Sequence, residues 1–374
     1  MRSEWVARIL ELGTELVQVF VAGGIIIDNV VASDGTVHRQ TMGGNGVYSA
    51  AGARLWLDSV GIVGSVPSNY PMDWLAALRA SGIDTSGITR VDETVDASEW
   101  FFYRGNGSRV DRLYAAPNDY EAFGLKGSSV TPTEAAAFEK YLRNRISPGR
   151  SFAEFRQANP LRSNQIPDGY WSAAGVHLAP GPMQVQTSLA ADLCGGGRCI
   201  SMDPGPPEPA VNLDAPVIAQ DFSMVDAVLP SEKELAMMAP GASVEKGLAI
   251  LIEAGAEIAA VKRGAHGSVF RTRHDSTSHR VPPIAVTARD PTGAGDAYCG
   301  GFLAGLVATG DALNAALCGT VSASFAVEAF GPFHLLAANR DAVSRRFRQL
   351  AAQCGATDAE QRLAVIFQNS PTRS

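Results

Sequence analysis

The sequence predicts an α/β fold built on a mostly parallel sheet with helices on both faces. From residue 175 onward, short apolar segments that favour strands alternate with longer segments of helical period. This alternation is typical of strand–helix–strand crossovers. The chain has 374 residues, of which 46% are hydrophobic and 18% charged, so it can bury a substantial core. We therefore expect one domain over residues 1–374.

The N-terminal segments predict the first strands and helices. Residues 3–17 have apolar side chains at helical spacing, which predicts a short leading helix. Residues 17–27 form an apolar, β-branched run, which predicts one buried parallel strand with Asp28 at its carboxyl edge. The segments that follow predict a strand pair over 30–42, a helix over 47–57, a strand over 60–66 and a helix over 71–81.

A hairpin over 97–116 predicts a small β lid together with residues 29–42. Residues 117–172 contain a helical segment over 134–145 and otherwise lack a clear period, so we interpret them as an insertion. The run Trp100-Phe101-Phe102 is apolar enough to join two copies of the chain as a homodimer through the lid. Packing of the same rings on the body of the domain is the alternative.

The C-terminal half predicts the regular part of the sheet. Strands are expected over 175–178, 199–202, 227–229 and 258–262, with helices between them over 183–194, 232–238 and 244–254. Alanine-rich helices are expected up to residue 329, followed by a terminal helix over 337–354.

The most informative segment lies between residues 290 and 296 and reads Asp-Pro-Thr-Gly-Ala-Gly-Asp. Gly293 and Gly295 allow strained backbone angles and a close approach to a ligand. The amides of Gly293, Ala294 and Gly295 would point out of a helix N-terminus, which favours an anion. A carboxylate beside an anion is expected if Asp296 takes a proton from a hydroxyl that attacks a bound phosphate. The simpler interpretation of Asp296 is an acid that caps the helix.

Four further segments have residues that suit such a site. They are Asp28 after the first strand, the Gly43-Gly44-Asn45-Gly46 turn before a helix, Asp203-Pro204 after a strand together with Ser231 to Glu234 after the next one, and the turn from Lys262 to Gly267. Each has a structural alternative. Asp28 could cap a loop, and the Gly43 to Gly46 segment could be a tight strand-to-helix turn. The acids near Ser231 could be helix N-terminal acids, and the Lys262 to Gly267 segment could be a surface turn. Lys262 at a strand end beside two glycines is placed to neutralise a polyphosphate.

These segments, in this order, resemble the ribokinase-like (PfkB) sugar and nucleoside kinases over roughly residues 18–350. The resemblance implies a ribokinase-like three-layer αβα sandwich with a mostly parallel central sheet and a small β lid. It implies ATP-dependent phosphoryl transfer to a hydroxyl of a sugar or related small molecule. In that reaction Asp296 is the general base, and the amides from Gly293 to Gly295 are the anion hole.

The resemblance also implies roles for the other residues. Those that bind the acceptor are Asp28, Gly43, Gly44 and Asn45, and those that bind the nucleotide are Ser231, Lys262, Gly264, Gly267 and Thr292. Glu234 is expected to hold Mg²⁺ through water, and the region of Asp290 to hold a monovalent cation such as K⁺. The chain departs from the family at two positions, because Asn45 stands where ribokinases often have Lys and Ser231 where the family usually has Asn.

Three alternatives to a sugar kinase stay open at this point. The first is a nucleoside kinase of the same fold. The second is a non-catalytic ribokinase-like protein that senses or binds a sugar, which the Ser231 departure and the insertion favour. The third is an unrelated doubly wound binding module, which would leave Asp28, Glu234 and Asp296 in family order by coincidence. The acceptor itself cannot be named from the sequence.

Composition excludes several other classes. The net charge of −7 and the pI near 5.4 argue against a nucleic-acid binder. The Walker A, dinucleotide, nucleophile-elbow and His-Glu-x-x-His motifs do not occur. The five cysteines lack metal-ligand spacing and are expected to be free thiols of the core in a reducing cytoplasm. No apolar stretch is long enough to span a bilayer, so we expect no membrane partner. We expect the protein to be cytoplasmic.

Overall fold

The structure is a computed structural model that describes residues 16–32, 36–103, 109–110, 151–205 and 222–368. The helix expected over 134–145 lies outside these ranges, as does nearly all of the helix expected over 3–17.

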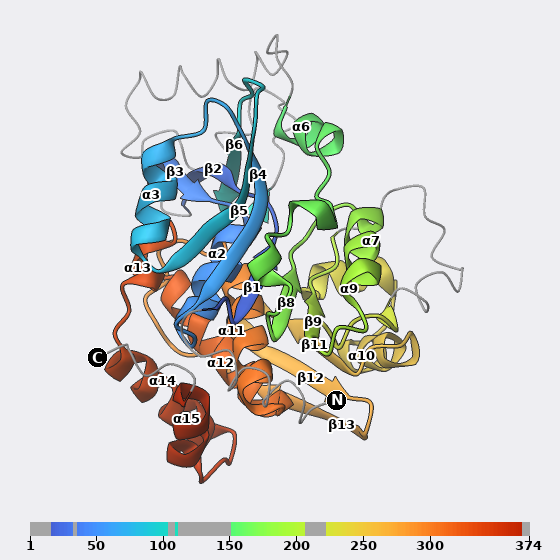
Figure 1. Cartoon of the computed structure of the whole chain (residues 1–374). Coiled ribbons are helices and arrows are strands. Elements are labelled where there is room, and N and C mark those ends of the chain that lie inside the picture. Colours follow the sequence, from blue (N-terminus) through green and yellow to red (C-terminus); the bar gives the residue numbers. More distant parts are fainter. Residues whose placement is uncertain (1–15, 33–35, 104–108, 111–150, 206–221, 369–374) are drawn as a thin grey trace.

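A nine-stranded sheet forms the middle layer, in the order β13-β12-β11-β10-β9-β8-β1-β4-β5 (Figure 1). All neighbours from β5 to β11 run parallel, and β12 and β13 are added antiparallel at one edge. The strands are β1 (Val19–Ala22), β4 (Val60–Pro67), β5 (Ile83–Val91), β8 (Gly175–Leu178), β9 (Cys199–Met202), β10 (Ala227–Val228), β11 (Ile258–Lys262), β12 (Ser268–Thr272) and β13 (Asp275–Val281). The chain moves outward from β1 to β5 and then returns to β8 on the other side of β1. Such a reversal leaves a crevice at the carboxyl ends of the two strands.

Helices cover both faces of this sheet, as predicted (Figure 1). Side chains of β1 alternate between the two faces, because Val19 and Val21 belong to one core cluster and Phe20 and Ala22 to the other. The first face is covered by α2 (Asn45–Arg54), α11 (Ala294–Thr309) and α12 (Ala312–Ala326), and the second by α7 (Met183–Leu193), α9 (Glu232–Met238) and α10 (Val244–Glu253). The remaining α-helices are α3 (Met72–Ala80), α6 (Phe152–Ala158), α13 (Phe333–Leu336), α14 (Arg340–Gln353) and α15 (Ala359–Phe367).

A second sheet of four strands forms the small lid, in the order β3-β2-β6-β7. Its strands are β2 (Ile26–Val31), β3 (Val37–Gly43), β6 (Ser98–Tyr103) and β7 (Arg109–Val110). Trp100 and Phe102 are buried within this chain. The exposed aromatic face expected for a dimer contact is therefore absent, which favours the alternative of packing on the body. A homodimer through another part of the lid stays a prediction.

One predicted strand is wrong. Residues 17–27 form two elements, since β1 ends at Ala22 and β2 begins at Ile26 in the other sheet. The break occurs at Gly23, where a β-carbon would lie 2.7 Å from the β-carbon of Ala179 and 2.8 Å from the α-carbon of Gly46. The backbone of this segment is thus crowded by two other segments as it leaves the large sheet. Asp28 consequently lies inside lid strand β2 and not at the carboxyl edge of β1.

Other elements were not expected. Strands β5, β12 and β13 lack a counterpart in the sequence-based prediction, because their polar alternation reads as loop. The last part of the predicted insertion is ordered by burial, since Phe152, Phe155 and Tyr170 are in the core. Short 3₁₀ turns connect this part to the body, and they are η1 (Ser163–Gln165) and η2 (Asp168–Tyr170).

Two expectations about chemistry can be compared with the described residues. Cys199, Cys299 and Cys318 are buried free thiols as expected, whereas Cys194 is exposed. Among the helices that the structure describes, none has the length and apolar character needed to cross a membrane.

The contact between α2 and α11 provides a test of the fold. A β-carbon at Gly300 would lie 1.7 Å from the carbonyl oxygen of Ser49, so Gly300→Ala must separate the two helices. We expect this variant to lose about 3 kcal/mol or more of unfolding free energy in urea, at the upper end for overpacking. Gly169→Ala is the matched control, because nothing lies within 4 Å of a β-carbon there. Equal stability of the two variants would contradict the backbone contact.

Candidate active site

The turn that begins α11 lies directly on a ring of α2. Gly293 is the residue before the helix and has a φ of 73°, in the left-handed region. A β-carbon at Gly293 would fall 2.2 Å from the ring of Tyr48, so only glycine fits there. The first amides of a helix have no partner within the helix. The amide of Ala294 donates to the carbonyl of Pro291 at 3.3 Å. Binding of an anion by the amides of Gly293, Ala294 and Gly295 stays a prediction.

Asp296 lies in the first turn of α11 and is only partly exposed. Burial raises the pKa of Asp296 to about 6, while Lys262 and Arg109 lower it and Glu234 raises it further. At pH 7 the carboxylate is mostly deprotonated, and its pKa is close enough to neutrality for efficient proton transfer.

Asp28 is buried in β2, and neither of its carboxylate oxygens has a hydrogen-bond partner among the described residues. A β-carbon on Gly43 would lie 1.9 Å from Asp28 Oδ2, which explains the glycine at that position. Burial raises the pKa of Asp28 well above its ordinary value, the charges of Asp290 and Asp296 raise it further, and Arg109 opposes them. A buried carboxylate without donors is costly to keep, and hydroxyl groups of a ligand would satisfy it.

The side chain of Asn45, which the sequence predicts to bind the acceptor, forms hydrogen bonds within the protein. Its Oδ1 accepts a hydrogen bond from the amide of Gly24 at 2.7 Å, and its Nδ2 donates to the carbonyl of Pro180 at 2.7 Å. These bonds tie the end of β1 to the loop after β8, so the amide is a brace of the site's wall. Gly44 begins α2 with a φ of 103° and a β-carbon there would lie 2.4 Å from the carbonyl oxygen of Gly24.

The lid contacts the α11 turn through one hydrogen bond. The hydroxyls of Tyr103 and Thr292 lie 2.9 Å apart, and the amide of Thr292 donates to Asp290 Oδ1 at 2.9 Å. Sequence reasoning missed Tyr103, which ends an aromatic strand, and also Tyr48 and Arg109. Nothing in the one-dimensional pattern marks these residues, because their importance depends on how the lid is placed over α11.

Lys262, which the sequence predicts to neutralise a polyphosphate, is paired with a carboxylate of the protein. Its ammonium, at the end of β11, forms an ion pair with the carboxylate of Asp203, at the end of β9. It also lies 3.4 Å from the sulfur of Cys299 on α11. The polyphosphate role expected for Lys262 therefore meets a competing partner inside the protein. Two glycines of the following turn have positive φ, 54° at Gly264 and 77° at Gly267.

Ser231 and Glu234 form a capping box at the start of α9. The Glu234 amide donates to Ser231 Oγ at 3.2 Å, and the Ser231 amide donates to Glu234 Oε2 at 2.6 Å. This is the structural alternative named for the two residues, although Glu234 also raises the pKa of Asp296 and so faces the site.

No cluster of three or more His, Cys, Asp or Glu side chains fit for a metal ion occurs in the parts of the chain that the structure describes. Glu234 uses its Oε2 in the capping box, so its other oxygen would fit the outer shell of a Mg²⁺ ion that phosphates and water hold, and this role stays a prediction.

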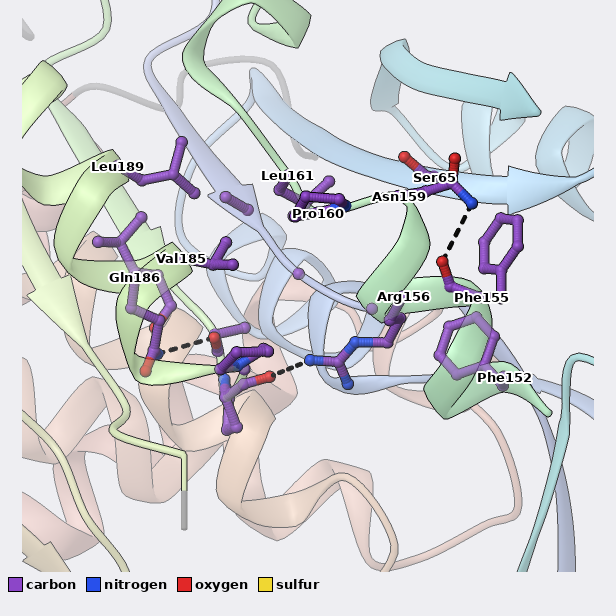
Figure 2. A pocket seen from close by; sticks show the side chains of 18 residues that line it. Ser65, Phe152, Phe155, Arg156, Asn159, Pro160, Leu161, Val185, Gln186 and Leu189 are labelled. Carbon is purple, nitrogen blue, oxygen red and sulfur yellow. Dashed lines mark hydrogen bonds between the residues drawn. The ribbon is translucent and has the colours of Figure 1, made fainter. Parts of the chain in front are cut away.

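A pocket opens at the carboxyl ends of β1 and β8 (Figure 2). It lies at the reversal of strand order, and its cavity volume is about 50 Å³. Figure 2 shows Phe152, Phe155 and Arg156 of α6 on one side and Val185 and Gln186 of α7 on the other. Gly24, which Asn45 braces, also lines the pocket, so the pocket and the Gly43–Asn45 turn share a wall.

Comparisons with known proteins agree with the predicted resemblance. Residues 203–337 match the family described as pfkB family carbohydrate kinase. A cytidine kinase of Thermococcus kodakarensis is 26% identical over 294 residues, which is 78% of this chain and 88% of that protein.

Solved structures show the same fold. A Burkholderia thailandensis nucleoside kinase in complex with ADP and inosine has a TM-score of 0.64 at 15% identity, covering 89% of this chain and 96% of that one. An E. coli protein described as ribokinase II, in complex with ATP and Mg²⁺, has a TM-score of 0.58 at 18% identity, covering 89% and 100%. The resemblance to the ribokinase-like kinases and the α/β fold that it implied are both confirmed.

The unsatisfied Asp28 carboxylate predicts an unusual stability effect. Because the pKa of Asp28 is raised in the folded state, its charge destabilises the fold increasingly as pH rises above the ordinary carboxyl range. Asp28→Asn should therefore gain about 1 kcal/mol or more in unfolding free energy at pH 8, and the gain should vanish near pH 4. Exposed Asp92→Asn is the control. Loss of stability in Asp28→Asn at pH 8 would show that the carboxylate has favourable partners.

Proposed function

We propose that this ribokinase-like chain transfers the γ-phosphoryl group of ATP to a hydroxyl of a sugar or nucleoside. The single observation that supports it most is that Asp28, an unsatisfied acid of the lid, interacts electrostatically with Asp296, a partly exposed acid in the first turn of α11. The kinase relative, the pfkB family match and the neighbour with bound ATP and Mg²⁺ support the same class of reaction.

Asp28 would accept hydrogen bonds from hydroxyls of the acceptor and so orient it. Asp296 would then take the proton of the attacking hydroxyl as the oxygen bonds to phosphorus. The amides of Gly293, Ala294 and Gly295 would hold the charge that grows on the transferring phosphoryl group. Arg109 of the lid lowers the pKa of both Asp28 and Asp296 and would add positive charge from the opposite side.

Mg²⁺, when bound with ATP, would neutralise and bridge the phosphates. Glu234 lies in place to accept a hydrogen bond from a water of that ion, through the carboxylate oxygen that the capping box does not use. Thr292, Gly264 and Gly267 would border the phosphates. A K⁺ ion near Asp290 stays a proposal carried over from the family.

Asp296→Asn tests the proposed base. We expect kcat to fall by about 10²–10⁴-fold, the contribution of a positioned base, while ATP affinity stays close to that of the wild type. In the wild type kcat/KM should fall as pH drops through about 6, because a base must be deprotonated and burial sets the pKa of Asp296 to about 6. A steady-state assay of ADP release gives both readouts. If Asp296→Asn keeps more than about a tenth of kcat, Asp296 is not the base.

The comparisons favour a nucleoside as the acceptor. A nucleoside has, beside its sugar, a flat and largely apolar ring that a monosaccharide lacks, and an apolar pocket wall gives that ring a surface to stack on. Phe152, Phe155 and Leu161 line it, and aromatic walls suit a base. The similarity to a cytidine kinase and to a nucleoside kinase structure points in the same direction.

Filling the pocket distinguishes the two acceptor classes. In a screen of sugars and nucleosides, Leu161→Trp should raise KM for nucleosides at least about tenfold, because the indole occupies the volume that a base would take. Leu161→Met is the control that keeps the volume. If the wild type phosphorylates free sugars faster than every nucleoside, and Leu161→Trp leaves those sugars unaffected, the acceptor is a sugar.

A further inference from the structure

A buried polar group lies beneath the α11 turn and has no role in the steps proposed so far. His177 of β8, Ser201 of β9, Asp203 directly after β9 and Lys262 of β11 form this group, with β10 between β9 and β11. Asp203 and Lys262 both contact the sulfur of Cys299 on α11. His177 Nδ1 is 3.0 Å from Ser201 Oγ, and the pKa of His177 is lowered to about 3 by burial and by the charge of Lys262, so its ring is neutral. The ion pair of the group is Asp203 with Lys262. Burial raises the pKa of Asp203 to about 8 although Lys262 lowers it, so Asp203 is ionised above about pH 8 and its uptake of a proton is measured there.

The ion pair between Asp203 and Lys262 is almost closed to solvent. Their side chains are only 3% and 10% exposed. Asp203 Oδ1 is buried without a hydrogen-bond partner in the described parts of the chain, and Oδ2 contacts only Lys262 and, at 3.6 Å, the sulfur of Cys299. Asp203 therefore depends on one lysine for compensation of its charge, and burial makes an unpaired carboxylate there costly.

The ammonium of that lysine lies next to the presumed phosphate position. The place where a β-carbon of Gly295 would be is 3.8 Å from Lys262 Nζ and 3.7 Å from its Cδ. Gly295 is exposed, so the lysine is separated from the open side of the turn by a residue without a side chain. The backbone of Lys262 is fixed, because its amide donates to the carbonyl of Pro230 at 2.9 Å. Only the flexible stem needs to rotate for the ammonium to reach an anion at the turn.

We propose that Lys262 exchanges partners, so that Asp203 holds its ammonium while the α11 turn is empty and the phosphates of a nucleotide take it when they bind there. This inference rests on the proposed function, because it needs a polyphosphate at Gly293 to Gly295. Asp203 is then a positioning residue that stores a cation and keeps it from Asp296 until nucleotide arrives.

The exchange has a cost that can be measured. When the ammonium leaves, the groups that Asp203 faces among the described residues are Cys299 and Asp296 of α11, Glu234 of α9 and neutral His177 of β8, and none of these is a cation. A buried carboxylate in such surroundings takes up a proton. Nucleotide binding should therefore be weakened by the presence of Asp203 and accompanied by proton uptake. If Asp203 were a fixed support for Lys262, its removal would instead weaken binding.

Calorimetric titration of the full chain with ADP and Mg²⁺ tests whether Asp203 weakens or strengthens nucleotide binding. Asp203→Asn should bind ADP about three- to tenfold more tightly than wild type, and Lys262→Met about ten- to a hundredfold more weakly. Asp226→Asn is the matched control, since Asp226 is a half-buried acid that accepts a bond from the amide of Ile200 at the other end of β9. It should leave the affinity unchanged.

Proton uptake is counted by repeating the titration in two buffers of different ionisation enthalpy. The Asp296→Asn background is used, because a carboxylate beside bound phosphate also takes up a proton. Uptake in that background, and its loss when Asp203→Asn is added, supports the exchange. If Asp203→Asn alone does not fold, the double variant Asp203→Asn with Lys262→Met replaces it, because the double variant leaves no buried charge unpaired. The double variant should show no proton uptake on binding ADP.

Two results would overturn the inference and are distinguishable. Weaker ADP binding by Asp203→Asn, with no proton uptake in the Asp296→Asn background, would make the ion pair a static support and leave the proposed function intact. No binding of ADP or ATP by the wild type would remove the proposed function and this inference together.

Discussion

The site depends on how closely α2 and α11 approach each other. A β-carbon on Gly300 would lie 1.7 Å from the Ser49 carbonyl oxygen, and one on Gly52 2.1 Å from the Ala297 carbonyl oxygen. The two helices thus touch through their backbones, with no side chain between them. Both begin at glycine turns, and their contact brings the turns together so that Gly293 rests on the ring of Tyr48. The two glycine turns, which we propose to bind the phosphate and the acceptor, are neighbours because of this packing.

The second constraint is the charge that this arrangement concentrates. Burial is the largest cause of the raised pKa at Asp28, Asp203, Asp290 and Asp296, and for most of them another acid adds to it. Lys262 and Arg109 are the cations that oppose this effect. Such a site is unfavourable for folding and persists because the rest of the domain is well packed. Binding of cations, or of a ligand with several hydroxyl groups, would reduce part of this unfavourable free energy.

Sequence reasoning predicted the layers of the fold but not every boundary. The alternation after residue 175 identified β8 to β11 and the helices between them, since buried parallel strands are continuous apolar runs. It failed at 17–27, because β1 and β2 are both apolar and only the crowding around Gly23 separates them. It missed β12 and β13, whose exposed faces are polar.

The candidate site was predicted unevenly for a similar reason. Residues in local motifs, such as Gly293 to Asp296, lie where the motif places them. Asp203, Tyr48, Tyr103 and Arg109 come from four separate elements and converge only in three dimensions. The pairing of Lys262 with Asp203 also required the sheet order, because β9 and β11 are not adjacent strands.

The division of the first apolar run into β1 and β2 has a mechanical consequence. The chain passes between the body and the lid at Gly23 to Ile25, at Gly44 between β3 and α2, and over residues 92–97 between β5 and β6. Asp28 therefore belongs to the lid, whereas Asp296 belongs to the body. Any rotation of the lid about these connections would carry Asp28 away from Asp296 and break the bond between Tyr103 and Thr292. The distance between the two acids thus depends on the angle between the lid and the body, and neither part of the molecule fixes it alone.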